Sequence, residues 1–174
     1  MGFDLNSTGN HRSESGAYFR NNVWWWRRLA TFVCEHTGIV DEKDKKKWQH
    51  NDGHKVSNEE HEIDEEQALQ IAKQLKALIK NGTVSKAIKE TKEEMKQAEE
   101  NNKHVELCHH MLREVVEKET GKKGLAPANY PKNHHDTWAW IQSKYSYGSS
   151  YPFTLENVEK FINFCEQSNG FTID

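Results

Sequence analysis

Residues 84–119 have the sequence VSKAIKETKEEMKQAEENNKHVELCHHMLREVVEKE, in which a stripe of mostly apolar side chains advances by alternating steps of four and three. This spacing keeps the stripe on one side of an α-helix for more than four heptads, with Glu and Lys dominating the other positions. The stripe consists of Val84, Ile88, Thr91, Met95, Ala98, Asn102, Val105, His109, Leu112 and Val116. The pattern predicts one long helix over about 84–119 and leaves open a break at residues 99–103. A seam of this length is typical either of packing within the chain or of self-association.

Three other segments also have helical signatures. No Gly or Pro interrupts the sixteen residues 22–37, and Asn22 or the Asn before it is a favourable N-cap. Ser57 and Glu60 have the spacing of a capping box, so we expect a second helix from there to the Asn-Gly pair before the long helix. A last helix is expected within residues 154–170, between a Thr N-cap and a Ser-Asn-Gly stop.

Residues 134–153 fit two structures. Trp138 and Trp140 alternate as in a strand, whereas Trp138 and Ile141 are one helix turn apart. This segment is therefore left open. The apolar C-terminal tail at residues 171–173 is expected to pack back on the core beside the apolar residues of the N-terminus.

The chain has the size and composition of one folded domain. Its 174 residues are enough to bury a core without disulfide or metal staples, and its six Trp, seven Phe and five Tyr exceed what disordered chains contain. We predict a mainly α fold, a single compact helical domain over residues 1–174. The helix at 84–119 is expected to project from the body or to be an insertion, and short strands are allowed at the termini and in 134–153.

Charge and cysteine content limit the partners and the compartment. With 24 basic and 27 acidic side chains the net charge is −3, so neither bulk nucleic acid nor an acidic membrane is an expected partner. No apolar run approaches the roughly 20 residues of a membrane span, and the start lacks a secretory signal. The odd number of well-separated cysteines predicts free, buried thiols and a cytoplasmic protein: Cys34, Cys108 and Cys165.

The most distinctive segment is the aromatic and basic run at residues 18–28, YFRNNVWWWRR. Aromatic faces stack on nucleobases, Arg pairs with phosphate and Asn reads base edges, and the first N–H groups of a helix attract anions. The run therefore predicts a site for a small anionic or nucleotide-like ligand. The candidate ligand-binding residues are Phe19, Arg20, Asn21, Asn22, Trp24, Trp25, Trp26, Arg27 and Arg28.

The same run also has a purely structural interpretation. Tryptophans on a helix are most often core residues, and arginines that stack on them most often make packing and cation–π contacts. The two Asn residues can be explained as helix N-caps. Three consecutive indoles sweep about 200° of a helix, more than one apolar stripe needs. Trp25 and Trp26 are expected to face the core, which leaves Trp24, beside Arg28 and near Arg20, as the indole in need of another contact.

Histidines offer a different function, that of a nucleotide hydrolase or phosphodiesterase using acid/base groups. The candidates for that role are His50, His54, His134, His135 and Asp136. Their spacing is not that of a zinc motif, and the sequence contains no phosphate loop, nucleophile elbow, His-Glu-x-x-His or Cys-x-x-Cys. We therefore expect no metal or cofactor, assign no catalytic residue, and favour a binding protein over an enzyme.

Segments at both ends and in the first half of the chain resemble a group of small uncharacterised proteins carried by bacteriophages and prophages. The resemblance rests on residues 1–5, 16–27, 51–57 and 161–173, and above all on the pattern G-x-YFRNN-x-WWWR. Residues 85–135 lie outside it, consistent with the long helix being an insertion particular to this member. The resemblance implies no particular activity or binding residue.

A phage setting, implied by that resemblance, sharpens the functional expectation. Small phage accessory proteins without enzyme motifs often bind a host component, and one strategy is to sequester the nucleotide signals of antiviral defence. We expect an accessory binding protein of this type in the host cytoplasm, with a homo-oligomer as one possible state. The alternatives are a protein–protein interaction module that uses the long helix and the histidine-dependent enzyme.

Overall fold

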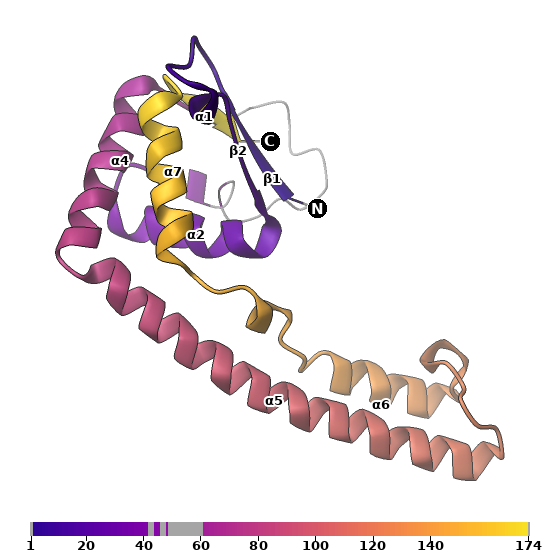
Figure 1. Cartoon of the computed structure of the whole chain (residues 1–174). Coiled ribbons are helices and arrows are strands. Elements are labelled where there is room, and N and C mark those ends of the chain that lie inside the picture. Colours follow the sequence, from indigo (N-terminus) through magenta and orange to yellow (C-terminus); the bar gives the residue numbers. More distant parts are fainter. Residues whose placement is uncertain (1, 42–43, 46–47, 49–60, 174) are drawn as a thin grey trace. The chain divides into compact units, whose positions relative to one another are not determined.

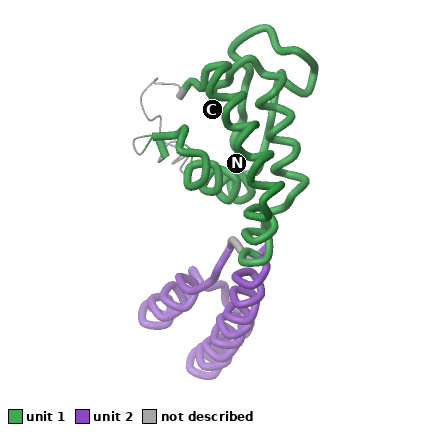
Figure 2. The backbone as a smooth tube through the Cα atoms, turned by 90° about the vertical axis from the view of Figure 1, so that its left-hand side faces the viewer, with its two compact units in different colours: residues 1–91, 151–174 green, residues 92–150 purple. Residues whose placement is uncertain are grey.

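The computed structural model is mainly α, with a small sheet (Figure 1). Its residues form two compact units, which are described separately (Figure 2). Unit 1 consists of Met1–Thr91 and Tyr151–Asp174, and unit 2 of Lys92–Ser150. The prediction of a mainly α fold is confirmed, and the prediction of a single domain stays a prediction. The structure describes residues 2–41, 44–45, 48 and 61–173.

The sheet of unit 1 joins the two ends of the chain. Its four strands are antiparallel in the order β2-β1-β4-β3. Leu5 lies opposite Phe19 on one side and Ile173 on the other. The expected strands at the termini and the return of the C-terminal tail to the core are thereby confirmed. The strands are β1 (Gly2–Ser7), β2 (Tyr18–Asn22), β3 (His61–Ile63) and β4 (Phe171–Ile173).

Three helices described in unit 1, α2, α4 and α7, begin at side-chain caps that local chemistry favours, whereas α1 has none; unit 1 also contains the first residues of the long helix. The Asn22 side chain accepts the N–H groups of Trp24 and Trp25 at 3.1 and 3.0 Å, and the Thr154 hydroxyl accepts that of Asn157 at 3.2 Å. The predicted first and last helices are confirmed. The helices are α1 (Glu14–Ala17), α2 (Val23–His36), α4 (Glu65–Lys80) and α7 (Leu155–Gln167).

Helix α4 starts later than the sequence pattern suggests. Its capping box is formed by Asp64 and Gln67, with the Gln67 N–H 2.7 Å from the Asp64 carboxylate, and strand β3 precedes it. The expected capping box at Ser57 and Glu60 lies outside the described residues. The predicted start of this helix was wrong. An Asp-x-x-Gln sequence can form a capping box as Ser-x-x-Glu can, and the one at Asp64 lies closer to the apolar stripe of the helix.

One apolar core holds the sheet and helices of unit 1 together. Alternation places one side of each strand inward, as expected where one face of an antiparallel sheet is covered by helices. Phe161 of α7 lies near its centre, with its ring centroid 5.3 Å from that of Phe19 and 5.8 Å from that of Trp26. The largest side chains of this core are Phe3, Phe19, Trp26, Phe32, Trp48, Phe153, Phe161, Phe164 and Phe171.

Unit 2 pairs the distal part of α5 with α6. Helix α5 (Thr83–Thr120) is continuous through residues 99–103, which confirms the long helix. Residues 134–153, left open by the sequence, contain most of α6 (Lys132–Gln142) and a 3₁₀ turn, η2 (Tyr147–Ser150). A second 3₁₀ turn, η1 (Pro127–Asn129), lies in the loop before α6.

Helix α6 covers the apolar seam of α5 in unit 2. Val105, Leu112 and Val116 of α5 form a cluster with Ile141 of α6. Within the seam the Asn102 side chain donates to the Ser146 carbonyl at 3.0 Å and accepts the Ser146 N–H at 2.8 Å. The seam in unit 2 is therefore used within the chain, which explains why polar Asn102 is tolerated there.

Candidate ligand-binding surface

The five residues of β2 alternate between the core and the surface. Phe19 is 8% exposed and Asn21 is 5% exposed, and the Asn21 side-chain amide donates to the Asn157 side chain at 3.1 Å. Residues that alternate along a strand point to opposite faces of a sheet, which places these two inward. Both were candidate ligand contacts; the structure places them in the core of unit 1, facing α7.

The other face of β2 is occupied by local polar contacts. Arg20 lies opposite Asp4 in the sheet, with its Nε 3.5 Å from the carboxylate, and Tyr18 donates its hydroxyl hydrogen to the same carboxylate. This hydrogen bond raises the pKa of Tyr18, because the Asp4 carboxylate stabilises the protonated phenol. Arg20 is thus paired with Asp4 within the sheet.

Trp26 is a core residue, as expected. It is 0% exposed, and its indole N–H donates to the Trp48 carbonyl at 2.6 Å. Trp25, however, is 41% exposed, so the prediction that it faces the core is wrong. Consecutive helical residues lie 100° apart, and the sheet and α7 meet the side of α2 that carries Trp26, Leu29, Ala30 and Val33.

Trp24 and Trp25 instead meet Tyr151, which returns to unit 1 just before α7. The Trp24 and Tyr151 rings are nearly parallel, 15° apart with centroids 6.2 Å apart, and Trp25 meets Tyr151 edge-on at 6.5 Å. We call these three residues the aromatic shelf. Trp24 and Tyr151 are half-buried, which leaves the more exposed Trp25 as its most accessible ring. Tyr151 was not among the candidates, because a contact between positions so far apart leaves no local signal.

Positive charge lies beside the shelf. The Arg27 guanidinium carbon is 5.3 Å from the centroid of the Trp24 ring, a cation–π distance, and Arg28 is also half-buried. The first N–H groups of α2 were expected to contact an anion. Two of them donate to the Asn22 side chain instead. The shelf therefore offers aromatic faces and guanidinium groups more than free backbone donors.

No family model, curated protein or solved structure matches this chain. Its function is accordingly inferred from the residues themselves. In the part of the chain that the structure describes, no helix is long and apolar enough to cross a membrane.

The histidine candidates do not assemble into one site in the described residues. His134 is buried and pairs with Glu119 at 2.6 Å, which ties α6 to α5, whereas His135 is exposed and lies 3.9 Å from its neighbour Asp136. His50 and His54 lie outside the described residues. Among the described residues no group of three or more His, Cys, Asp or Glu is placed to hold a metal ion.

None of the three cysteines forms a disulfide, as expected, but only two of them are buried. Cys34 and Cys165 lie in the core of unit 1, and burial raises the pKa of the Cys165 thiol well above its ordinary value. Cys108 is exposed on α5, which corrects the expectation that all three are buried. Cys108 is exposed because it lies outside the apolar seam of that helix.

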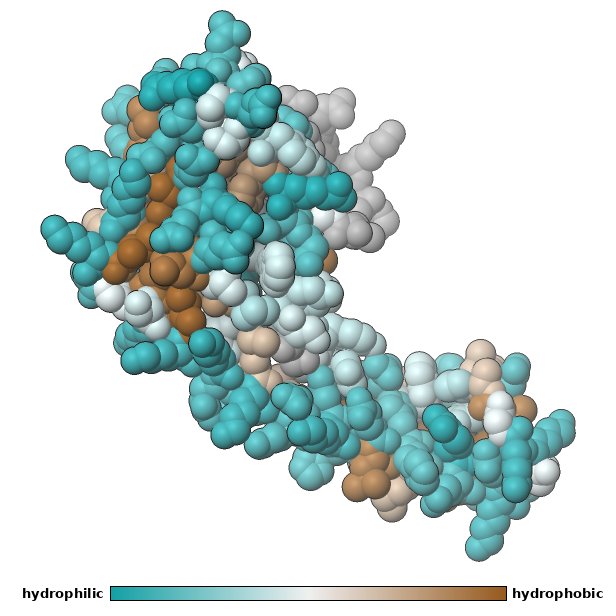
Figure 3. Space-filling view, in the orientation of Figure 1, coloured by the Kyte–Doolittle hydropathy of each residue, from teal (hydrophilic) through white to brown (hydrophobic). Residues whose placement is uncertain are grey.

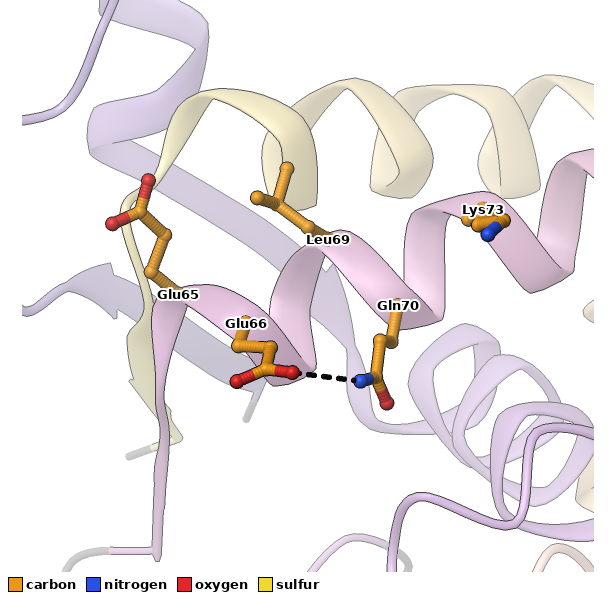
Figure 4. A pocket seen from close by; sticks show the side chains of 5 residues that line it. All are labelled: Glu65, Glu66, Leu69, Gln70 and Lys73. Atoms are coloured by element: carbon orange, nitrogen blue, oxygen red, sulfur yellow. Dashed lines mark hydrogen bonds between the residues drawn. The ribbon is translucent and has the colours of Figure 1, made fainter.

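A hollow of about 340 Å³ on unit 1 is formed by α4 alone (Figure 4). Glu66 accepts a hydrogen bond from Gln70 at 3.3 Å, and Glu65 pairs with Arg12 at 2.5 Å. Leu69 lies between these polar groups. Because one exposed helix face supplies every lining residue, the hollow lacks the opposing wall that would enclose a ligand.

Proposed function

We propose that the protein binds a small nucleotide-like anion on the aromatic shelf, without converting it. The observation that carries the proposal is the gathering of Trp24, Trp25 and Tyr151 with Arg27 at one place on unit 1. Rings stack on any nucleobase, each stack being worth about 1–3 kcal/mol, and a guanidinium pairs with phosphate. Of the nine residues that the sequence suggests, this site uses Trp24, Trp25, Arg27 and Arg28.

The biological setting of this proposal comes from the resemblance to phage and prophage proteins. We propose that the chain acts in the host cytoplasm as an accessory protein that sequesters a nucleotide signal of antiviral defence. A sequestering protein needs affinity and not catalysis, which agrees with a sequence that lacks the common hydrolase and phosphate-loop motifs.

Retention of nucleotide by the purified protein tests the proposal. After incubation with a panel of cyclic and linear nucleotides and removal of the excess, intact nucleotide is expected in the supernatant of the heat-denatured protein, measured by mass spectrometry.

Trp25→Ala is expected to weaken binding by about 5- to 150-fold, the equivalent of one lost stack. Trp140→Ala is the matched control, because Trp140 is 64% exposed and lies in unit 2.

Arginine variants locate the phosphate contact. Arg27→Ala is expected to lower retention, whereas Arg20→Ala is expected to leave it unchanged because Arg20 faces Asp4. Wild-type protein that retains no nucleotide, or equal retention by the Trp25 and Trp140 variants, would reject the shelf as the site. Conversion of a nucleotide to product would instead support the enzyme alternative.

A second candidate function, self-association through α5, has its own observation. Leu107, Met111 and Val115 are 56%, 57% and 44% exposed and recur every four residues. Hydrophobic side chains gather on the side of α5 away from α6 (Figure 3). In an antiparallel pair of these helices with a two-fold axis at Met111, Leu107 of one copy matches Val115 of the other. This symmetry favours a second copy of the chain as the occupant.

The oligomeric state decides this second candidate. Light scattering coupled to size exclusion is expected to give a dimer mass, and Met111→Glu is expected to give a monomer, because the two new carboxylates would face each other across the axis. Glu106→Gln, an exposed change on the same helix, serves as the control. A monomer mass for the wild type at its highest soluble concentration would contradict the proposal.

A further inference from the structure

Unit 2 contains a pocket of about 320 Å³ between α5, the loop that follows it and α6. This volume lies at the lower end of the roughly 300–1,000 Å³ found for small-molecule sites. Helix α5 supplies one wall with His109, Arg113 and Glu117, which are spaced by four residues and so lie on one side of the helix. The loop and α6 add Leu125, Tyr130 and Trp138 to the lining.

The two charged residues of the pocket are one helix turn apart, yet they form no ion pair with each other. The Glu117 carboxylate instead accepts the Gly124 N–H at 3.0 Å, which holds the loop against α5. Arg113 has no ion pair or hydrogen bond with any residue that the structure describes. The pocket thus presents one positive and one negative group that neighbouring side chains do not neutralise.

His109, on the same side of α5, takes part in a hydrogen-bond network with residues of α6 and η2. Gln142 donates its amide to the Tyr147 hydroxyl at 2.6 Å, so its carbonyl oxygen is left to accept from His109 Nε2 at 3.1 Å. This network assigns the hydrogen to Nε2 and leaves Nδ1 as an acceptor. That Nδ1 atom is buried and has no hydrogen-bond partner among the described residues. Because Nδ1 is buried, it is not accessible to a molecule in the pocket.

Aromatic and apolar side chains of the loop and α6 also line the pocket. The Trp138 indole lies 5.5 Å from the His109 ring at an angle of 37°, and Trp138, Tyr130 and Leu125 are all half-buried. Half-buried rings at the edge of a pocket give a flat ligand a face on which to pack.

We propose that this pocket is a second ligand site, for a small zwitterion that carries a flat ring, the chemistry of an aromatic amino acid. Arg113 pairs with the carboxylate, Glu117 accepts from the ammonium group, and Trp138 packs on the ring. Glu117 disfavours multiply charged phosphates by repulsion, so the site is chemically different from the aromatic shelf of unit 1. The proposal does not depend on nucleotide binding by that shelf.

Calorimetric titration of the full chain with L-phenylalanine and L-tryptophan tests the proposal. At least one of them is expected to bind. N-acetyl-L-phenylalanine, which lacks the cation, and phenethylamine, which lacks the carboxylate, are each expected to bind about 10-fold more weakly or worse, the cost of one charge-assisted hydrogen bond. Absence of binding by both amino acids, or equal binding of the blocked analogues, would overturn the proposal.

Variants separate a binding role from a structural one. Arg113→Gln and Glu117→Gln are each expected to weaken amino acid binding about 10-fold. The glutamine side chain introduced by Glu117→Gln keeps an oxygen that can accept the Gly124 N–H, and circular dichroism checks that unit 2 stays helical. Lys118→Gln is the control, an exposed neutralising change on the same helix. Equal binding by all three variants would remove Arg113 and Glu117 from the site.

Discussion

Replacing Trp26 by alanine is expected to lower the free energy of unfolding by about 3–5 kcal/mol, the range for large aromatic side chains lost from a core. The indole is 0% exposed, and its ring centroid lies 5.6 Å from those of both Phe3 and Trp48. The variant also loses the hydrogen bond from Trp26 to the Trp48 carbonyl. Urea denaturation followed by circular dichroism at 222 nm measures the change.

Trp25 is the matched control for this prediction. It is the next residue of the same helix and the same side chain, but 41% of its surface is exposed. Trp25→Ala is therefore expected to cost no more than about 1 kcal/mol, although it removes the most accessible ring of the shelf. Similar losses of stability for the two variants would show that the two tryptophans are equally buried, contrary to the structure.

The second large effect is expected at Gly16, in the short helix α1. A Cβ atom at this position would lie 2.2 Å from the Gln167 carbonyl oxygen and 2.3 Å from its carbon. Both are backbone atoms at the end of α7, so neither can move aside as a flexible side chain would. Gly16→Ala is expected to destabilise unit 1 by about 3 kcal/mol or to prevent folding, because α1 must separate from α7.

Gly9→Ala provides the comparison. Its Cβ would meet only Asn169 atoms at 3.8 Å, an ordinary contact distance, and Gly9 is not among the glycines with positive φ. Its effect on the free energy of unfolding is expected to stay within about 1 kcal/mol. Thermal melts recorded by circular dichroism compare the stabilities of the two variants. A Gly16 variant as stable as the Gly9 variant would show that α1 and α7 do not approach as closely as the structure has them.

Local rules of chain geometry account for the parts of the fold that could be predicted. Asn22 and Thr154 cap the helices that follow them, because each offers a side-chain oxygen to N–H groups two or three residues ahead. The seam beginning at Val84 predicts the long helix α5, because steps of four and three keep one helix face apolar, although the sequence left open a break at residues 99–103 that the structure does not have. These requirements act within a few residues, so the sequence alone reveals them.

The sheet and the candidate sites were decided by contacts between distant parts of the chain. In strand β2 Phe19 lies opposite Leu5 of β1, and no local pattern identified residues 18–22 as a strand. The same holds for the aromatic shelf, whose third ring, Tyr151, arrives only after the chain has passed through unit 2.

The aromatic run at residues 18–28 shows most clearly what the sequence by itself determined and what it did not. Helical periodicity established that three consecutive indoles cannot share one apolar stripe, so at least one had to lie elsewhere. Only the tertiary structure decided which: the sheet and α7 cover Trp26 and leave Trp25 exposed. A helix specifies the angles between its side chains, but the side it turns to the core depends on what packs against it, which in this protein comes from both ends of the chain.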